Sequence, residues 1–194
     1  MPEGGRIIAG TCRGMRLEAP RGGTTRPLSD RVKESLFGSL EAEGLLGGPF
    51  LDLFAGTGAA GIEALSRGAP RATFVERDGG NCAVIGANLR RTRLDGGRVV
   101  RADVVAFLHN GRPTDDQPYR ACLVDPPYGD PILSQALELL GDGAKGWLAP
   151  DGVVVAKHFW RDEPPPEVGE LRASRRRRYG ETALTFYTRP EEAA

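Results

Sequence analysis

The sequence has few cysteines, few lysines and no long hydrophobic run. Its three cysteines, Cys12, Cys82 and Cys122, are odd in number and widely spaced, which argues against a disulfide framework and a Cys-x-x-Cys metal site. No apolar stretch approaches the length of a membrane span, and no hydrophobic segment follows the N-terminal residues as in a secretory signal. We therefore expect a monomeric protein of the reducing cytoplasm, without a membrane anchor or a metal.

Arginine supplies nearly all of the positive charge. Only three of the 26 basic residues are lysines, and the formal net charge is zero. The first 33 residues carry seven basic groups against three acids, and a further run covers 175–178. Clustered arginines are typical of phosphate recognition, although a GC-rich genome that favours arginine codons, together with ordinary solvated faces, would give the same pattern. The candidate nucleic-acid contacts are Arg6, Arg13, Arg16, Arg26 and Arg31.

The middle of the chain alternates between short apolar runs and stretches with helical spacing. Strands are expected at 50–54, 72–75, 98–101, 119–124 and 152–157, and helices at 59–67, 80–93, 104–108 and 130–140. This alternation predicts an α/β fold with a parallel sheet covered by helices on both faces. Two last runs, 171–179 and 182–188, flank Gly180 and predict an antiparallel hairpin at the edge of the sheet.

The first 28 residues differ in composition from the remainder. They are rich in glycine, arginine and proline and contain two short alternating pieces, at 6–9 and 14–17, which predict a basic hairpin-like extension. Ser29 or Asp30 can cap a helix that runs to about residue 43. We therefore divide the chain into an extension at 1–28, a main domain at 29–190 and a tail at 191–194.

A glycine-rich loop follows the first strand of the main domain. Gly56-Thr57-Gly58-Ala59-Ala60-Gly61 matches G-x-G-x-x-G, and Glu76 ends the next strand 20 residues after Gly56. Glycines allow the main chain to approach a ligand closely, and the carboxylate can bind both hydroxyls of a ribose. The pattern satisfies the dinucleotide-binding fingerprint, so an NAD-dependent oxidoreductase is one hypothesis.

Two acidic residues favour S-adenosylmethionine over NAD. Asp52 lies inside the first strand, where a dinucleotide-binding strand is normally apolar, and a buried carboxylate needs a partner such as an amino-acid ammonium group. Asp103 follows the third strand and can accept a hydrogen bond from an adenine amine, although it could also be a helix N-cap. Asp52, the loop, Glu76 and Asp103 together fit the parts of S-adenosylmethionine.

The turn Asp125-Pro126-Pro127-Tyr128 follows the apolar run 121–124. The prolines have no N–H, fix their own φ angles and hold the residues before them extended. The Asp125 carboxylate and the Pro126 carbonyl can accept both hydrogens of an amine, and Tyr128 can stack on the ring that carries it. These contacts orient the amine and stabilise its developing positive charge. The turn alone fits adenine, cytosine, guanine or an amide as the acceptor.

These motifs together resemble the class I S-adenosylmethionine-dependent N-methyltransferases. A narrower resemblance, to the bacterial RsmD-like 16S ribosomal RNA guanine-N2 methyltransferases that modify guanine 966, covers nearly the whole chain. It is carried by Arg6-Ile7-Ile8-Ala9-Gly10, Arg13-Gly14-Met15-Arg16-Leu17, the stretch from Arg26 to Phe37, Asp52 to Gly58, and Gly61 to Ala69.

The resemblance implies a Rossmann-like, seven-stranded, mostly parallel sheet and methyl transfer to a guanine N2 amine in 16S ribosomal RNA, within an assembling 30S particle. Another RNA or DNA base, or a protein amide, is the alternative acceptor. The catalytic residues would be Asp125, Pro126, Pro127 and Tyr128. The S-adenosylmethionine site would comprise Asp52, Phe54, Ala55, Gly56, Thr57, Gly58, Glu76, Arg77, Asp103 and Val104.

Overall fold

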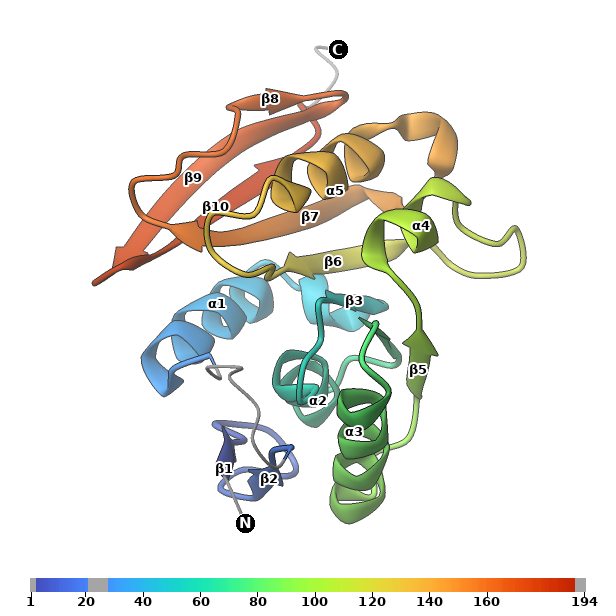
Figure 1. Cartoon of the computed structure of the whole chain (residues 1–194), viewed down its shortest axis with the longest axis vertical. Coiled ribbons are helices and arrows are strands. Elements are labelled where there is room, and N and C mark those ends of the chain that lie inside the picture. The colour runs from blue at the N-terminus through green and yellow to red at the C-terminus, as the bar shows by residue number, and fades with distance from the viewer. Residues whose placement is uncertain (1–2, 21–27, 191–194) are drawn as a thin grey trace.

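A computed structural model describes residues 3–20 and 28–190. An eight-stranded sheet lies between two helical layers, and a two-stranded hairpin, β1 (Glu3–Arg6) with β2 (Arg16–Glu18), lies at one end of the molecule (Figure 1). Among the described residues, no helix is both long and apolar enough to cross a membrane.

The sheet has the strand order β5-β4-β3-β6-β7-β10-β9-β8. The strands from β5 to β7 are parallel, and β10, β9 and β8 complete the sheet in antiparallel orientation. Their bounds are β3 Phe50–Leu53, β4 Ala72–Glu76, β5 Gly97–Arg101, β6 Tyr119–Val124, β7 Leu148–Phe159, β8 Glu167–Val168, β9 Leu171–Tyr179 and β10 Thr182–Thr188.

The helices match the expected ones within a few residues. They are α1 Asp30–Ala42, α2 Ala59–Ser66, α3 Gly79–Thr92, α4 Val104–His109 and α5 Ile132–Gly141, with short 3-10 turns at Leu45–Gly47 and Gly143–Lys145. The Ser29 hydroxyl caps α1 by accepting from the Val32 N–H. The α/β fold is therefore confirmed, with one difference: the sheet has eight strands instead of seven, because Glu167–Val168 pairs with β9.

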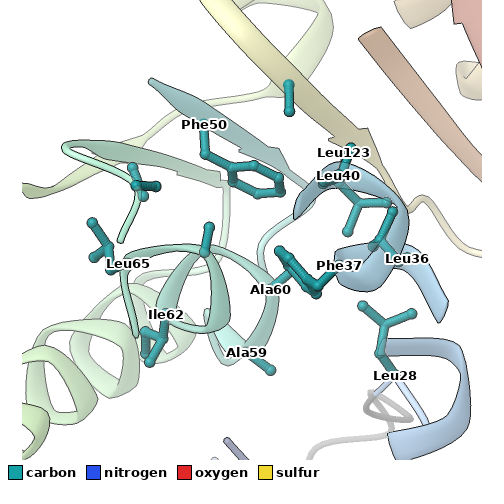
Figure 2. Packing of buried hydrophobic residues seen from close by; sticks show 14 of the residues in the cluster. Leu28, Leu36, Phe37, Leu40, Phe50, Ala59, Ala60, Ile62, Leu65 and Leu123 are labelled. Carbon is teal, nitrogen blue, oxygen red and sulfur yellow. The ribbon is translucent and has the colours of Figure 1, made fainter. Parts of the chain in front are cut away.

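Two buried clusters cover the two faces of the sheet. On one face, α1 and α2 pack against the sheet, with Phe37 of α1 lying 5.8 Å from Phe50 of β3 between ring centroids (Figure 2). On the other face, α4 and α5 pack against β6 and β7 around the buried Trp147. Because both faces are covered, the inner parallel strands β3, β4 and β6 are apolar along most of their length, whereas the edge strand β5 is largely exposed.

The N-terminal hairpin is joined to the main domain by buried hydrogen bonds. β1 begins three residues before the strand expected at 6–9, and β2 begins two residues after the strand expected at 14–17. The reason is that most of the expected first strand forms a loop that is hydrogen-bonded to α2. There the Glu63 carboxylate, fully buried, accepts from the N–H groups of Ile8 (2.8 Å) and Ala9 (3.0 Å) and from Arg67 Nε (2.8 Å). Ile7 and Leu17 of this segment belong to the same hydrophobic cluster as α1 and α2.

The Glu63 carboxylate offers a direct test of this attachment. Glu63→Ala leaves two partly buried N–H groups without their acceptor and the buried Arg67 without its Glu63 partner, so we expect the free energy of unfolding to fall by about 3 kcal/mol in urea denaturation. Glu138→Ala, an exposed change on α5, is the control and should change stability by less than about 0.5 kcal/mol. A loss of below about 1 kcal/mol for Glu63→Ala would contradict this role.

Candidate active site

A cavity of about 430 Å³ opens at the carboxyl ends of the parallel strands. Successive strands of the sheet place acidic residues around it: Asp103 after β5, Glu76 at the end of β4, Asp52 in β3 and Asp125 after β6. The cavity therefore crosses the point between β3 and β6 where the strand order reverses, which is where open α/β sheets bind ligands. Its size suits a small organic molecule.

Asp52 is buried and points into this cavity from β3. Its Oδ2 accepts from the Gly61 N–H (2.8 Å) in the first turn of α2. Burial raises the pKa of Asp52 well above its usual value; the Gly61 hydrogen bond opposes this rise, and the nearby charges of Asp125 and Glu76 add to it. Three carboxylates close together in a buried site favour a positively charged ligand, which would lower the pKa of Asp52 again.

The loop after β3 has an unusual main-chain conformation. Phe54 has φ +61°, a left-handed value that is strained for an aromatic residue, and Gly56 and Gly58 are left-handed as well. The cavity is lined by Phe54, Ala55, Gly56 and Thr57. Gly58 is the N-cap of α2 and does not line the cavity. A Cβ on Gly61 would lie 2.3 Å from the Phe74 ring, so this third glycine allows α2 to pack closely on β4.

Glu76 fixes the conformation of that loop from the neighbouring strand. Its Oε2 accepts from the Gly56 N–H and its Oε1 from the Asp78 N–H, both at 2.8 Å. The carboxylate still borders the cavity, and each oxygen has a second lone pair for a ligand hydroxyl. Arg77, beside it, is exposed and also lines the cavity.

Asp103 is a helix N-cap, one of the two roles that its position suggested, and it also borders the cavity. It is the N-cap of α4, with Oδ1 accepting from the Ala106 N–H (3.0 Å). It also lines the cavity together with Val104, and no hydrogen bond to its Oδ2 occurs within residues 3–20 and 28–190. A cap therefore does not prevent this carboxylate from accepting a hydrogen bond from a ligand amine.

The turn 125–128 forms the opposite wall of the cavity. Asp125 Oδ1 accepts from the ammonium group of Lys157, at the end of β7. The Asp125 side chain is 18% exposed. Burial raises its pKa, and the charge and hydrogen bond of Lys157 oppose that rise. Within the described residues, Asp125 Oδ2 receives no hydrogen bond, so it is available to an incoming amine.

Tyr128 completes the turn with an accessible ring. Within the described ranges it is the one large hydrophobic residue that is exposed to solvent, with 46% of its surface accessible. The Lys157 ammonium lies 4.9 Å from its ring centroid, and its hydroxyl bonds to Thr182 Oγ1 at 2.7 Å. The ring is thus held in place at the mouth of the cavity, where a planar substrate could stack on it.

Sequence reasoning missed Lys157. A signal was present, because a lysine ends the apolar run 152–156 in a chain with only three lysines. Its pairing with Asp125 depends on β7 lying beside β6, which follows from the strand order and not from any local motif. Lys157 is therefore a cation, paired with Asp125, in a cavity that four acidic residues border.

The four candidate RNA contacts that the structure describes do not line the cavity. Arg6 pairs with Asp30 (2.7 Å) and is 62% exposed. Arg13 and Arg16 are exposed on the N-terminal hairpin, and Arg31 is exposed on α1 with its guanidinium 5.9 Å from the Tyr179 ring centroid. Arg26 lies outside the described residues.

Comparisons with known proteins agree with this architecture. The family model "Conserved hypothetical protein 95" matches residues 5–188. Ribosomal RNA small subunit methyltransferase D of Escherichia coli K12 is 34% identical over 95% of this chain and 89% of its own length, and YlbH of Bacillus subtilis is 38% identical over 94% and 97%.

Solved structures extend the match to the fold. A hypothetical protein of Thermus thermophilus superposes with a TM-score of 0.80 at 34% identity, over 95% of this chain and 99% of that one. The Escherichia coli protein yhhF superposes with a TM-score of 0.83 at 31% identity, over 98% and 100%. The chain therefore belongs to the conserved hypothetical protein 95 family, the RsmD-like family that its sequence resembles.

Proposed function

We propose that this protein transfers a methyl group from S-adenosylmethionine to the N2 amine of a guanine in 16S ribosomal RNA. The observation that carries the proposal is the shared cavity: a carboxylate-bordered cofactor site and the turn 125–128 face the same space. The Escherichia coli relative named as a small subunit methyltransferase supports the choice of RNA. We further propose that a monomer acts in the cytoplasm, on an assembling 30S particle.

The cavity fits the proposed cofactor in charge and in shape. S-adenosylmethionine supplies a methyl group on a positively charged sulfonium and also carries an ammonium group. Asp52 would bind the ammonium, Glu76 the ribose hydroxyls and Asp103 the adenine amine, while residues 54–57 provide main-chain contacts. The acidic border is less favourable for NAD, whose pyrophosphate is an anion, and this argues against the oxidoreductase hypothesis.

The turn 125–128 would hold and activate the acceptor amine. Asp125 Oδ2 and the Pro126 carbonyl accept its two hydrogens, which directs the nitrogen lone pair into the cavity. As positive charge develops on the nitrogen, the Asp125 carboxylate stabilises it and can then accept the released proton. Tyr128 stacks on the base, and Pro127 keeps the turn stiff. Lys157 orients Asp125 and favours its ionised form against the effect of burial.

Binding of S-adenosylmethionine should depend on the charge of Asp52. Asp52→Asn keeps an acceptor for Gly61 but removes the charge, so we expect calorimetry to show affinity reduced about ten- to a hundredfold. In the unmodified protein, affinity should fall as the pH is lowered, since protonation neutralises the carboxylate. Asp95→Asn, exposed and outside the cavity, is the control. Tight binding of NAD without S-adenosylmethionine would overturn the proposal.

Asp125→Asn tests the transfer step. The amide cannot stabilise a developing cation or take a proton, so we expect methyl transfer to 30S particles from a deletion strain to slow at least about a hundredfold. Affinity for S-adenosylmethionine should change little. Mass spectrometry of 16S ribosomal RNA should show N2-methylguanosine lost in the deletion strain and restored by the unmodified gene alone. Restoration by Asp125→Asn would contradict the catalytic assignment.

Lys157→Met tests the control of the pKa of Asp125. Because Lys157 lowers the pKa of a carboxyl group that burial raises, its removal should raise that pKa further. The rate requires the ionised form, so the acidic limb of the pH–rate profile should move to higher pH. Lys145→Met, a change at a lysine bonded to the His109 carbonyl outside the cavity, should leave the profile unchanged. An unmoved limb in Lys157→Met would show that Asp125 does not depend on this ion pair.

A further inference from the structure

Two arginines contact one aromatic ring where the end of β7 meets the β9–β10 turn. The guanidinium carbon of Arg178 lies 3.6 Å from the Trp160 ring centroid, and that of Arg161 lies 4.8 Å from it. Both arginines are exposed, and Trp160 is half-buried. We call Trp160, Arg161 and Arg178 the Trp160 cluster.

Arg178 is held in a fixed orientation with free hydrogen-bond donors. Its Nε donates to the Gly180 carbonyl (2.8 Å), and its guanidinium lies against the Trp160 ring. Both of its Nη atoms lack a hydrogen bond within the part of the chain that the structure describes, and so do all the guanidinium nitrogens of Arg161. A planar fork with two free donors matches the geometry of a phosphate group.

Each of the other arginines of β9 uses at least one Nη donor within the protein. Arg172 donates to the Gly169 and Leu171 carbonyls. Arg175 pairs with Glu43, and Arg176 with Glu163 and the Trp160 carbonyl. Arg177 donates to Ser35 Oγ. Arg178 therefore differs from its neighbours in being fixed by a ring and by Nε while both Nη atoms remain accessible.

The Trp160 cluster lies next to the turn 125–128. The ring centroids of Tyr128 and Phe159 are 6.1 Å apart, and those of Phe159 and Trp160 are 6.3 Å apart. The Trp160 main-chain N–H donates to the Glu181 carbonyl, one residue before Thr182, which bonds to the Tyr128 hydroxyl. The cluster is thus two ring-to-ring contacts from the residue that would stack on the target base.

We propose that the Trp160 cluster binds a backbone phosphate of a nucleotide that flanks the target base in single-stranded RNA. This inference rests on the proposed function and adds a second contact point for the same substrate. Because Trp160 and Gly180 already orient Arg178, little side-chain freedom is lost when the phosphate binds. Asp162, Glu163 and Glu181 lie nearby in sequence, so the cluster provides a local contact within a surface of mixed charge.

The test compares Arg178→Ala with Arg172→Ala on the same strand. For an unmodified 16S ribosomal RNA fragment, we expect Arg178→Ala to weaken binding about tenfold and to reduce the slope of log affinity against log salt by about 0.7 for each lost phosphate contact. Arg172→Ala should change neither. For methyl transfer to 30S particles from a deletion strain, Arg178→Ala should raise KM and leave kcat unchanged.

Substitutions of Trp160 test whether its ring orients Arg178 for binding, and stability measurements show whether a variant has a folding defect. Trp160→Phe keeps a ring beneath Arg178 and should retain most of the affinity, whereas Trp160→Leu should approach Arg178→Ala. Thermal denaturation and S-adenosylmethionine affinity should match those of the unmodified protein in every variant used. An Arg178→Ala affinity and salt slope equal to those of Arg172→Ala would overturn the inference. Failure of the unmodified protein to methylate the particles would instead reject the proposed function, whatever the salt slopes show.

Discussion

The need to satisfy buried carboxylates shapes this molecule. Asp52 and Glu76 lie in neighbouring parallel strands with almost no exposure, and a buried charge without partners would cost several kcal/mol. Their partners are main-chain N–H groups: Gly61 for Asp52, and Gly56 and Asp78 for Glu76. Each bond holds a loop or the start of a helix against the strand ends. The shape of the cavity therefore follows from the way its own acids are stabilised.

The same acids determine what the cavity can bind. Main-chain dipoles and Lys157 offset part of the negative charge, but the pKa values of Asp52 and Asp125 remain raised by burial. A cationic ligand would supply the missing positive charge, and an anionic one would add to the repulsion. Lys157 lies on the opposite side of the switch point from Glu76, so its ammonium group is placed beside Asp125 on the proposed acceptor side of the site. Burying these acids costs stability in the ligand-free protein, and a cationic ligand would offset part of that cost when it binds.

Local sequence patterns predicted most of the fold and many of the residues that border the cavity. Alternation of apolar and helical segments located five helices, and the spacing of Asp52, Gly56 and Glu76 predicted that they would meet. Features that depend on pairing between distant segments were not predictable. The two-residue strand Glu167–Val168 has too few residues for a periodic signal and exists because β9 offers it an edge. Lys157 meets Asp125 through strand order alone.

The N-terminal hairpin shows how a segment with its own composition becomes part of the site's support. Buried Asn88 of α3 accepts from the Glu18 N–H through Oδ1 (2.8 Å), and its Nδ2 donates to the carbonyls of Glu18 and Thr57 (both 3.1 Å). Thr57 lies in the strained loop that lines the cavity. One side chain thus joins β2 to the proposed cofactor loop, and neither partner can move without leaving buried polar atoms unpaired. If the hairpin arginines contact RNA, the surface that receives the substrate and the loop that receives the cofactor are mechanically connected through Asn88.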